Sequence, residues 1–346
     1  HHDLTHLAVG HWVAGAWAKD VLLGVAADGR WSQIQPNASA QQQAAATRLG
    51  GPVLPGVVNA HSHAFQRAIV GLTERRSTGA ALADDFWSWR DRMYAAANCI
   101  TPEQMETIAS QLYAELLAGG YTQVCEFHYL HNAIAGSPYA KAAEMSLALV
   151  RAAQRTGMGL TLLPTLYMRA GFSESGLRHD QRRFASTPDS IARIVEDVQR
   201  HAAGDARINV GVAIHSLRAV HPAALKELAA YAHSAGLPVH IHIAEQTQEV
   251  DDCLVHTGQR PIEWLLNHAD VDKRWNLVHA TYTTPDELWG VQARGASIVI
   301  CPATEANLGD GVFDLPGYAK EHGTWSIGSD SHVTRRWSEE LRLLEY

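Results

Sequence analysis

The chain has 346 residues, of which 46% are apolar and 18% charged, and its formal net charge is −8. This composition excludes a disordered chain, and the acidic balance argues against a nucleic-acid surface, which needs a basic stripe. No apolar run approaches the roughly 18 residues of a membrane-spanning helix, and no segment resembles a cleavable signal.

The cysteines are few and widely spaced, and no CxxC pair occurs: Cys99, Cys125, Cys253 and Cys301. A disulfide framework is therefore not expected, and a reducing cytoplasm is the expected location. Histidine, in contrast, occurs 20 times. Because histidine is the commonest metal ligand and a frequent acid or base, this excess points to a metalloenzyme.

We expect residues 1–52 to form a small domain of β-strands, similar to a β-sandwich. Strands are predicted at His6–Ala14 and Val21–Ala27, and the polar stretch Gln41–Ala46 is predicted as a loop or a helical turn. From Val53 onward the pattern changes to alternating strands and helices.

This second part contains eight short apolar segments that end in polar residues and are predicted as strands. They are Val53–Asn59, Thr122–Phe127, Leu160–Leu166, Asn209–Ile214, Pro238–Ile243, Asn276–His279, Ser297–Cys301 and Trp325–Gly328. Helices are predicted between them, several with proline in the first turn: Pro102–Leu117, Tyr139–Arg155, Pro188–His201, Pro222–Ala235 and Pro261–His268.

Eight strand-then-helix units predict an α/β fold, a (β/α)8 TIM-like barrel over residues 53–346. The alternative, a doubly wound open sheet, usually carries a glycine-rich phosphate loop after its first strand. Here the first strand leads into Asn59-Ala60-His61-Ser62-His63 instead. The last helical segment, Trp337–Tyr346, is short, so we expect the eighth helix to be incomplete in this chain.

The His61-Ser62-His63 triplet is the first candidate for metal binding. Residues i and i+2 of a strand point to the same side, so both imidazoles can reach one ion. The spacing alone is weak, because chance predicts about one such triplet at this histidine content. The chain has a second at His240-Ile241-His242.

Position strengthens the signal, because further polar residues follow other predicted strands. His242 ends the fifth strand and Glu245 comes three residues later, His279 ends the sixth strand, and Asp330 follows the eighth. The carboxyl ends of barrel strands are where barrel active sites are built. Residues with purely structural roles would be scattered over both ends of the barrel.

This order of residues resembles the single-metal branch of the amidohydrolase superfamily. The bridging lysine of its two-metal members has no counterpart near Asn209–Arg218. The resemblance implies one divalent ion, usually zinc with iron as the alternative, held by His61, His63, His242 and Asp330. It also implies that hydroxide on the metal attacks the substrate. Glu245 would then shuttle a proton to the leaving nitrogen, His279 would orient or deprotonate the water, and Asp330 would accept a proton.

Several longer runs resemble the family of formimidoylglutamate deiminases. They are His61–Gly71, Phe86–Tyr94, Ile214–Val220, His240–Gln246, Cys301–Gly311 and Ile327–His332. The resemblance implies hydrolysis of N-formimino-L-glutamate to N-formyl-L-glutamate and ammonia, a step of histidine degradation. One departure is Ala303, where the family usually has threonine, and it touches none of the roles above.

A substrate with two carboxylates needs fixed cations, and arginine binds carboxylates in a bidentate manner. By resemblance, Arg218 and Arg90, in an aromatic-rich loop after the first strand, hold the carboxylates, while Gln66, Tyr129 and His215 add hydrogen bonds. Four of the five have a plainer explanation: Arg90 would stack on a surface tryptophan, Gln66 would lie on a helix face, and Tyr129 and His215 would be interior residues.

Two other functions stay open. One is a single-metal deaminase acting on guanine, a triazine or an adenosine derivative, against which a pair of essential arginines would count. The other is a non-catalytic metal-binding protein, against which Glu245 and His279 argue. The expected partner is a small dicarboxylate, with neither nucleic acid nor membrane, and a homodimer is expected because members of the superfamily are often dimers.

Overall fold

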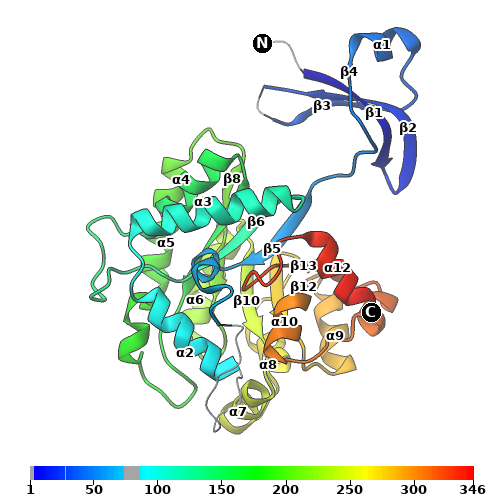
Figure 1. Cartoon of the computed structure of the whole chain (residues 1–346). Helices are drawn as coiled ribbons and strands as arrows, with labels where there is room; N and C mark the ends of the chain where they lie inside the picture. The colour runs from blue at the N-terminus through cyan, green and yellow to red at the C-terminus, as the bar shows by residue number, and fades with distance from the viewer. Residues whose placement is uncertain (1–3, 28, 74–85) are drawn as a thin grey trace. The chain divides into compact units, whose positions relative to one another are not determined.

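The structure is a computed structural model that describes residues 4–27, 29–73 and 86–346 (Figure 1). It divides the chain into two compact units, His1–Gly56 and Val57–Tyr346. The boundary lies beyond the expected position after residue 52, because Val53 still pairs with His11 of the small unit. The His11 Nδ1 atom also lies 2.8 Å from the Val53 carbonyl oxygen.

The small unit is one four-stranded sheet in the order β3-β2-β1-β4, with a short helix. Its elements are β1 (Leu4–Val13), β2 (Ala16–Val25), β3 (Trp31–Gln35), α1 (Ala40–Ala45) and β4 (Thr47–Arg48). The β1–β2 hairpin turns at Ala14 and Gly15, which both have positive φ, as a tight hairpin turn requires. The two predicted strands and the helical turn are present, whereas β3 and β4 were not predicted. The β-sandwich remains a prediction, since the described residues form a single sheet.

The large unit has parallel strands in the order β13-β12-β11-β10-β9-β7-β6-β5, with β8 beside β7. Their bounds are β5 (Val57–Ser62), β6 (Tyr121–His128), β7 (Gly159–Leu166), β8 (Ile208–Val210), β9 (Val212–Ile214), β10 (Val239–Ile243), β11 (Trp275–His279), β12 (Ser297–Ile300) and β13 (Thr324–Ile327). Each predicted strand is present, although the first begins at Val57 and not at Val53, and the fourth is split at Gly211. The last strand returns to the first through a bridge between Ser62 and Asp330, so the (β/α)8 barrel is confirmed.

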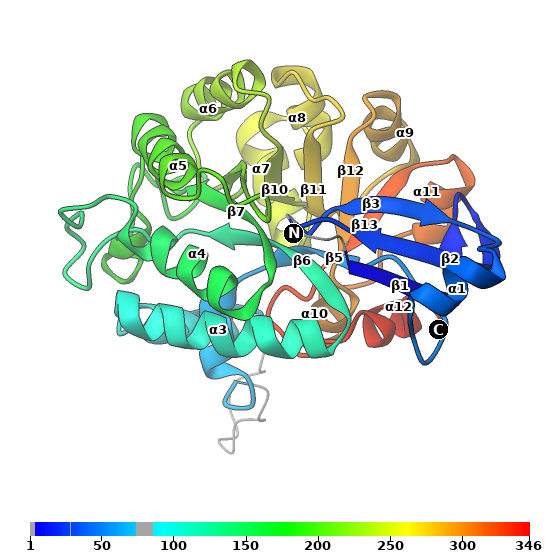
Figure 2. The ribbon, with the colours of Figure 1, turned by 90° about the horizontal axis from the view of Figure 1, so that it is seen from above.

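Helices surround these strands when the molecule is seen from above (Figure 2). They are η1 (Ala64–Ile69), α2 (Phe86–Ala97), α3 (Pro102–Ala118), α4 (Glu144–Thr156), η2 (His179–Phe184), α5 (Pro188–His201), α6 (Pro222–Ser234), α7 (Thr247–Thr257), α8 (Pro261–His268), α9 (Pro285–Ala293), α10 (Pro302–Leu308), α11 (Leu315–Lys320) and α12 (Trp337–Glu345). Thr101, Thr187 and Thr284 cap α3, α5 and α9 in front of the first-turn prolines. The predicted bounds of α5 and α8 are confirmed, whereas α4 begins later than the predicted Tyr139.

One prediction for the barrel mouth is wrong, because Arg90 lies on helix α2 and not in a loop. Met93, Tyr94 and Ala97 of this helix are buried and share one face. That burial stabilises a helix whose aromatic sequence shows no clear helical period.

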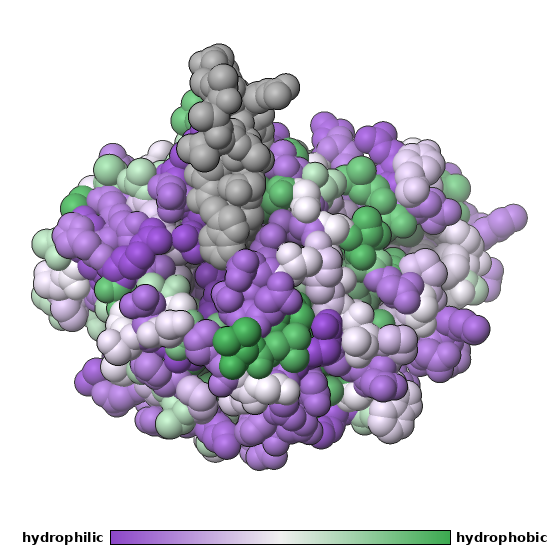
Figure 3. Space-filling view, turned by 90° about the horizontal axis from the view of Figure 1, so that it is seen from below, coloured by the Kyte–Doolittle hydropathy of each residue, from purple (hydrophilic) through white to green (hydrophobic). Residues whose placement is uncertain are grey.

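The face seen from below is mostly hydrophilic, with hydrophobic residues in separate small groups (Figure 3). Among the described residues, no helix combines the length and the apolar character needed to cross a membrane.

Candidate metal centre and active site

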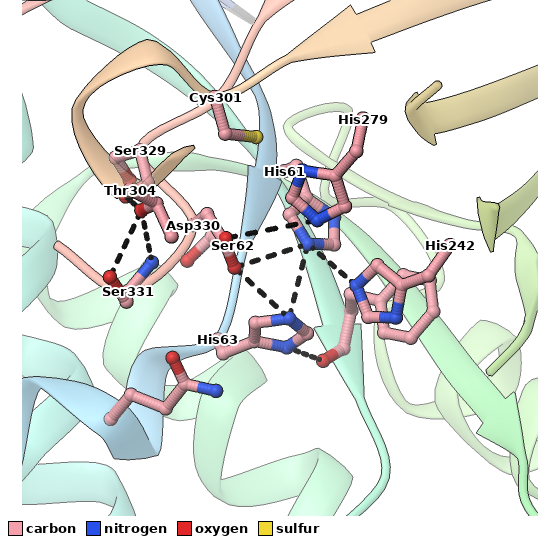
Figure 4. Close-up of polar contacts among 12 residues, drawn as sticks. His61, Ser62, His63, His242, His279, Cys301, Thr304, Ser329, Asp330 and Ser331 are labelled. Atoms are coloured by element: carbon pink, nitrogen blue, oxygen red, sulfur yellow. Dashed lines mark hydrogen bonds and ion pairs between the residues drawn. The ribbon is translucent and has the colours of Figure 1, made fainter. Parts of the chain in front are cut away.

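Three imidazoles and one carboxylate converge where strands β5, β10 and β13 end (Figure 4). The Nε2 atom of His61 lies 3.1 Å from Nε2 of His63 and 3.0 Å from Nε2 of His242. The Oδ1 atom of Asp330 lies 3.4 Å from Nε2 of His61 and 3.3 Å from Nε2 of His63. The four ligands expected from the sequence are therefore brought to one point.

The chemistry of this donor set fits a divalent cation. Burial lowers the pKa of His63 to about 3 and also lowers the pKa values of His61 and His242, so the imidazoles are neutral. His63 donates its Nδ1 hydrogen to the Phe127 carbonyl at 2.9 Å, which leaves the Nε2 lone pair facing the cluster. Burial by itself would raise the pKa of the Asp330 carboxyl, but the surrounding imidazoles outweigh burial and hold that pKa below the ordinary range. Converging lone pairs beside a carboxylate need a cation between them.

Glu245 and His279 lie beside this centre. Nε2 of His279 lies 3.6 Å from Oε1 of Glu245 and 3.9 Å from Oδ2 of Asp330. Burial raises the pKa of Glu245 to about 7. Burial lowers the pKa of His279, but the carboxylates of Glu245, Glu305 and Asp330 outweigh it and raise that pKa to about 10. The pair thus combines a carboxyl that can hold or release a proton near neutral pH with an imidazolium that stays charged there.

The backbone is strained where it presents these groups. Ala244, His279 and Asp330 have φ values of 53°, 72° and 44°, in the left-handed region that non-glycine residues seldom adopt. Such conformations persist only when the surroundings hold them, and they concentrate at functional sites.

Two buried carboxylates that the sequence analysis missed hold parts of this backbone. Glu249 accepts hydrogen bonds from the N–H groups of Ala244 and Glu245, each at 3.1 Å. Glu126 accepts hydrogen bonds from the hydroxyl of Ser62 at 2.8 Å and from the hydroxyl of Tyr113 at 3.2 Å. Glu249 supports the turn that carries Glu245, and Glu126 supports the histidine triplet.

A third missed carboxylate belongs to Glu305, on the first turns of α10. Its Oε1 atom lies 3.2 Å from Nδ1 of His279 and accepts the N–H of Cys301 at 2.9 Å. A glutamate near a helix start is usually solvated, so the only sequence signal was its place shortly after a strand end.

All five residues expected to bind the substrate line one cavity next to the metal centre. Gln66 lies on η1, Arg90 on α2, Tyr129 after β6, and both His215 and Arg218 after β9. The same cavity is lined by the candidate ligands His63, His242 and Asp330 and by Glu245 and His279. The structure brings these residues together, and their roles in binding remain predictions.

Arg218 is partly buried in the cavity wall. Its guanidinium makes no hydrogen bond or ion pair with any residue in the described ranges. Burial lowers the pKa of Arg218, but Tyr167, Glu249 and other neighbours outweigh burial and raise that pKa, so the side chain stays cationic. A partly buried guanidinium without a direct hydrogen-bond partner suits a bound anion.

The other lining residues offer an aromatic wall and hydrogen-bonding groups. The Arg90 guanidinium carbon lies 5.6 Å from the ring centroid of Tyr94. Gln66 donates from Nε2 to the Tyr129 hydroxyl at 3.3 Å, and its buried Oε1 has no partner among the described residues. The His215 ring lies 4.2 Å from that of Tyr167.

The chain is similar to known proteins in both sequence and structure. A sequence model described as "Amidohydrolase family" matches residues 53–344. The chain is 47% identical over 332 residues to a "Formimidoylglutamate deiminase" of Pseudomonas aeruginosa, covering 95% of this chain and 71% of that protein. It is 26% identical to a "5-methylthioadenosine/S-adenosylhomocysteine deaminase" of Natronomonas pharaonis, covering 80% of this chain and 57% of that protein. A solved amidohydrolase structure from Brucella melitensis superposes with a TM-score of 0.92 at 42% identity, covering 100% of this chain and 75% of that one.

Proposed function

Because this chain belongs to the amidohydrolase family, we propose that it hydrolyses N-formimino-L-glutamate to N-formyl-L-glutamate and ammonia. The relative from Pseudomonas aeruginosa is named for this deimination. The observation that carries the proposal is the pair of arginines, Arg90 and Arg218, in the cavity beside the metal centre. Flat, uncharged guanine, triazine or adenosine substrates would leave the Arg218 charge without a partner.

His61, His63, His242 and Asp330 would hold one divalent ion, with zinc as the proposed metal and iron as the alternative. When bound, the ion would lower the pKa of a water molecule toward neutrality and so supply the nucleophile at physiological pH. The protein residues then have to bind the dianion, orient the formimino carbon and move protons.

The carboxylates of the substrate would bind Arg90 and Arg218, with hydrogen bonds from Tyr129 and His215. Such fixed contacts convert an intermolecular attack into one between positioned groups. Oε1 of Gln66, a buried acceptor without a partner among the described residues, suits an N–H of the formimino head. The substrate would thus lie with its charged end at the arginines and its head at the metal centre.

Glu245 and Asp330 would carry the protons. Water would add to the formimino carbon, with the protonated His279 orienting the water and Asp330 taking its proton. Glu245 would donate one proton to the terminal nitrogen, and the proton taken by Asp330 would pass to the same nitrogen. The carbon–nitrogen bond then breaks and ammonia leaves, while the hydroxyl proton of the adduct returns to Glu245 as the carbonyl of the formyl group forms. A carboxyl with a pKa of about 7 holds this proton at neutral pH and can release it.

Ammonia release is the direct test. Metal-loaded protein would be assayed with N-formimino-L-glutamate and, in parallel, with guanine. We expect release from the first substrate alone, loss of release on chelation, and recovery when zinc or iron is returned. Release from guanine alone would overturn the substrate assignment, and release that survives complete metal removal would overturn the metal role.

A further inference from the structure

We propose that Glu305 is a positioning residue that fixes the imidazole of His279 in its working orientation, an inference that rests on the proposed function. The two ring nitrogens of His279 face different partners. Nδ1 lies 3.2 Å from Oε1 of Glu305, while Nε2 lies 3.6 Å from Oε1 of Glu245. Both His279 and Glu305 are buried, so water does not compete for these contacts.

Glu305 is itself held in place. Its Oε1 atom accepts the N–H of Cys301, the residue that precedes helix α10, at 2.9 Å. The start of that helix is fixed from outside, because Glu340 of α12 accepts the N–H of Ala303 at 2.9 Å. The neighbouring Thr304 hydroxyl lies 2.9 Å from that of Ser331, near Asp330 (Figure 4). The carboxylate therefore forms part of a rigid wall.

A fixed carboxylate decides which edge of the imidazole meets the reacting groups. Rotating the His279 ring by 180° would remove the Nδ1 hydrogen from Glu305 and turn carbon atoms toward Glu245. The hydrogen bond to Glu305 opposes that rotation, so Nε2 stays directed at Glu245 and Asp330. A carboxylate behind the imidazole serves the same purpose in other acid–base groups, where it fixes the tautomer and the orientation of the ring.

A second metal site is the alternative explanation, because one ligand atom each of His279, Cys301 and Glu305 lie within 4.8 Å of one another. Two observations favour the positioning role. Burial and nearby carboxylates raise the pKa of the Cys301 thiol, so the thiolate that a metal needs is disfavoured. Oε1 of Glu305 already has two hydrogen-bond partners.

Steady-state kinetics of Glu305→Ala, Glu305→Gln and Glu305→Asp test the proposal on the metal-loaded protein. We expect Glu305→Ala to lower kcat roughly 10- to 100-fold, while KM and the single bound metal stay as in the unsubstituted protein. Glu305→Gln keeps an acceptor oxygen and should recover most of kcat. Glu305→Asp withdraws the carboxylate by one methylene and should recover less. If Glu305→Ala does not fold, the difference in kcat between Glu305→Gln and Glu305→Asp tests the proposal instead.

Glu287→Gln is the matched control. Glu287 is also buried and caps helix α9, but its partners are Arg260 and Thr284, outside the site. We expect this variant to lose thermal stability and keep kcat. An unchanged kcat in the Ala and Asp variants of Glu305 would overturn the proposal, as would two bound metal ions of which Glu305→Ala loses one.

A proton NMR measurement does not depend on turnover. The hydrogen shared by Nδ1 of His279 and Glu305 should give a resonance downfield of the backbone amides, coupled to nitrogen in 15N-histidine protein. It should vanish in Glu305→Ala and remain in Glu305→Gln. If the unsubstituted protein released no ammonia, the proposed function would fail while this spectrum still decided the role of Glu305. A spectrum unchanged in Glu305→Ala would overturn it.

Discussion

Asp330 is connected to His61 through both its backbone and its side chain. The Asp330 N–H donates to the His61 carbonyl at 3.0 Å, and Oδ1 of Asp330 lies 3.4 Å from Nε2 of His61. Asp330 follows β13, the last strand of the barrel, and His61 lies near the end of β5, the first strand. The two strand ends meet at the Ser62–Asp330 bridge. Closure of the barrel and assembly of the metal centre therefore depend on the same contacts.

Gly328→Ala should disturb that closure. A Cβ atom at Gly328 would lie 2.6 Å from Cβ of His61 and 2.9 Å from its backbone nitrogen and oxygen. Backbone atoms cannot move aside cheaply, so His61 must shift. We expect metal affinity to fall roughly tenfold or more, measured as metal content after dialysis against a competing chelator. Gly176→Ala, at an exposed position with nothing within 4 Å of the added atom, is the control. Equal metal retention by both variants would contradict the prediction.

Glu245→Gln should stop catalysis without removing the metal. The amide cannot donate the proton that the leaving nitrogen needs, and general acid catalysis of this type is worth roughly 10²- to 10⁴-fold. We expect kcat to fall within that range while metal content stays at one ion per chain. Metal analysis and ammonia assays on the same preparation give both quantities. Activity near that of the unsubstituted protein would remove Glu245 from the proton-transfer role.

Arg218→Met should weaken substrate binding. Hydrogen bonds to charged groups contribute roughly 1.5–3 kcal/mol, so we expect KM to rise about 10- to 150-fold with a smaller effect on kcat. Arg218→Lys keeps the charge but loses the planar pair of donors, and should fall in between. Arg151→Met, which breaks an ion pair with Glu106 on the outer helices, is the matched control and should leave KM unchanged. A KM unaffected by Arg218→Met would place the carboxylates elsewhere.

Glu340→Gln should change how stability depends on pH. Burial and neighbouring acids raise the pKa of Glu340 from 4.5 to about 8. The folded protein therefore binds this proton more tightly than the unfolded chain does. The resulting stabilisation is complete below pH 4.5 and is lost as pH rises through 8.

The glutamine cannot ionise, so the free energy of unfolding of Glu340→Gln should increase relative to the unsubstituted protein as pH rises from 5 to 8. Denaturant unfolding of both proteins at these two pH values measures the difference. A difference that stays constant between pH 5 and pH 8 would show that Glu340 ionises normally.

The sequence by itself was sufficient to predict the barrel and the position of its candidate metal centre. Short apolar segments alternate with helices, and His61, His242, His279 and Asp330 each end or follow a strand. Because parallel strands place their carboxyl ends on one face, this order predicts that the side chains meet without any knowledge of packing.

Only the tertiary structure decided those features that depend on which side chains are buried. Arg90 lies on a helix because Met93 and Tyr94 find a buried surface there, which the aromatic sequence does not reveal. Glu249 and Glu305 are single glutamates near helix starts, where solvated carboxylates are common. Only the packed barrel shows that Glu249 meets the backbone of Glu245 and that Glu305 meets the ring of His279. Three-dimensional packing determines which groups these carboxylates meet, and the local sequence does not indicate those partners.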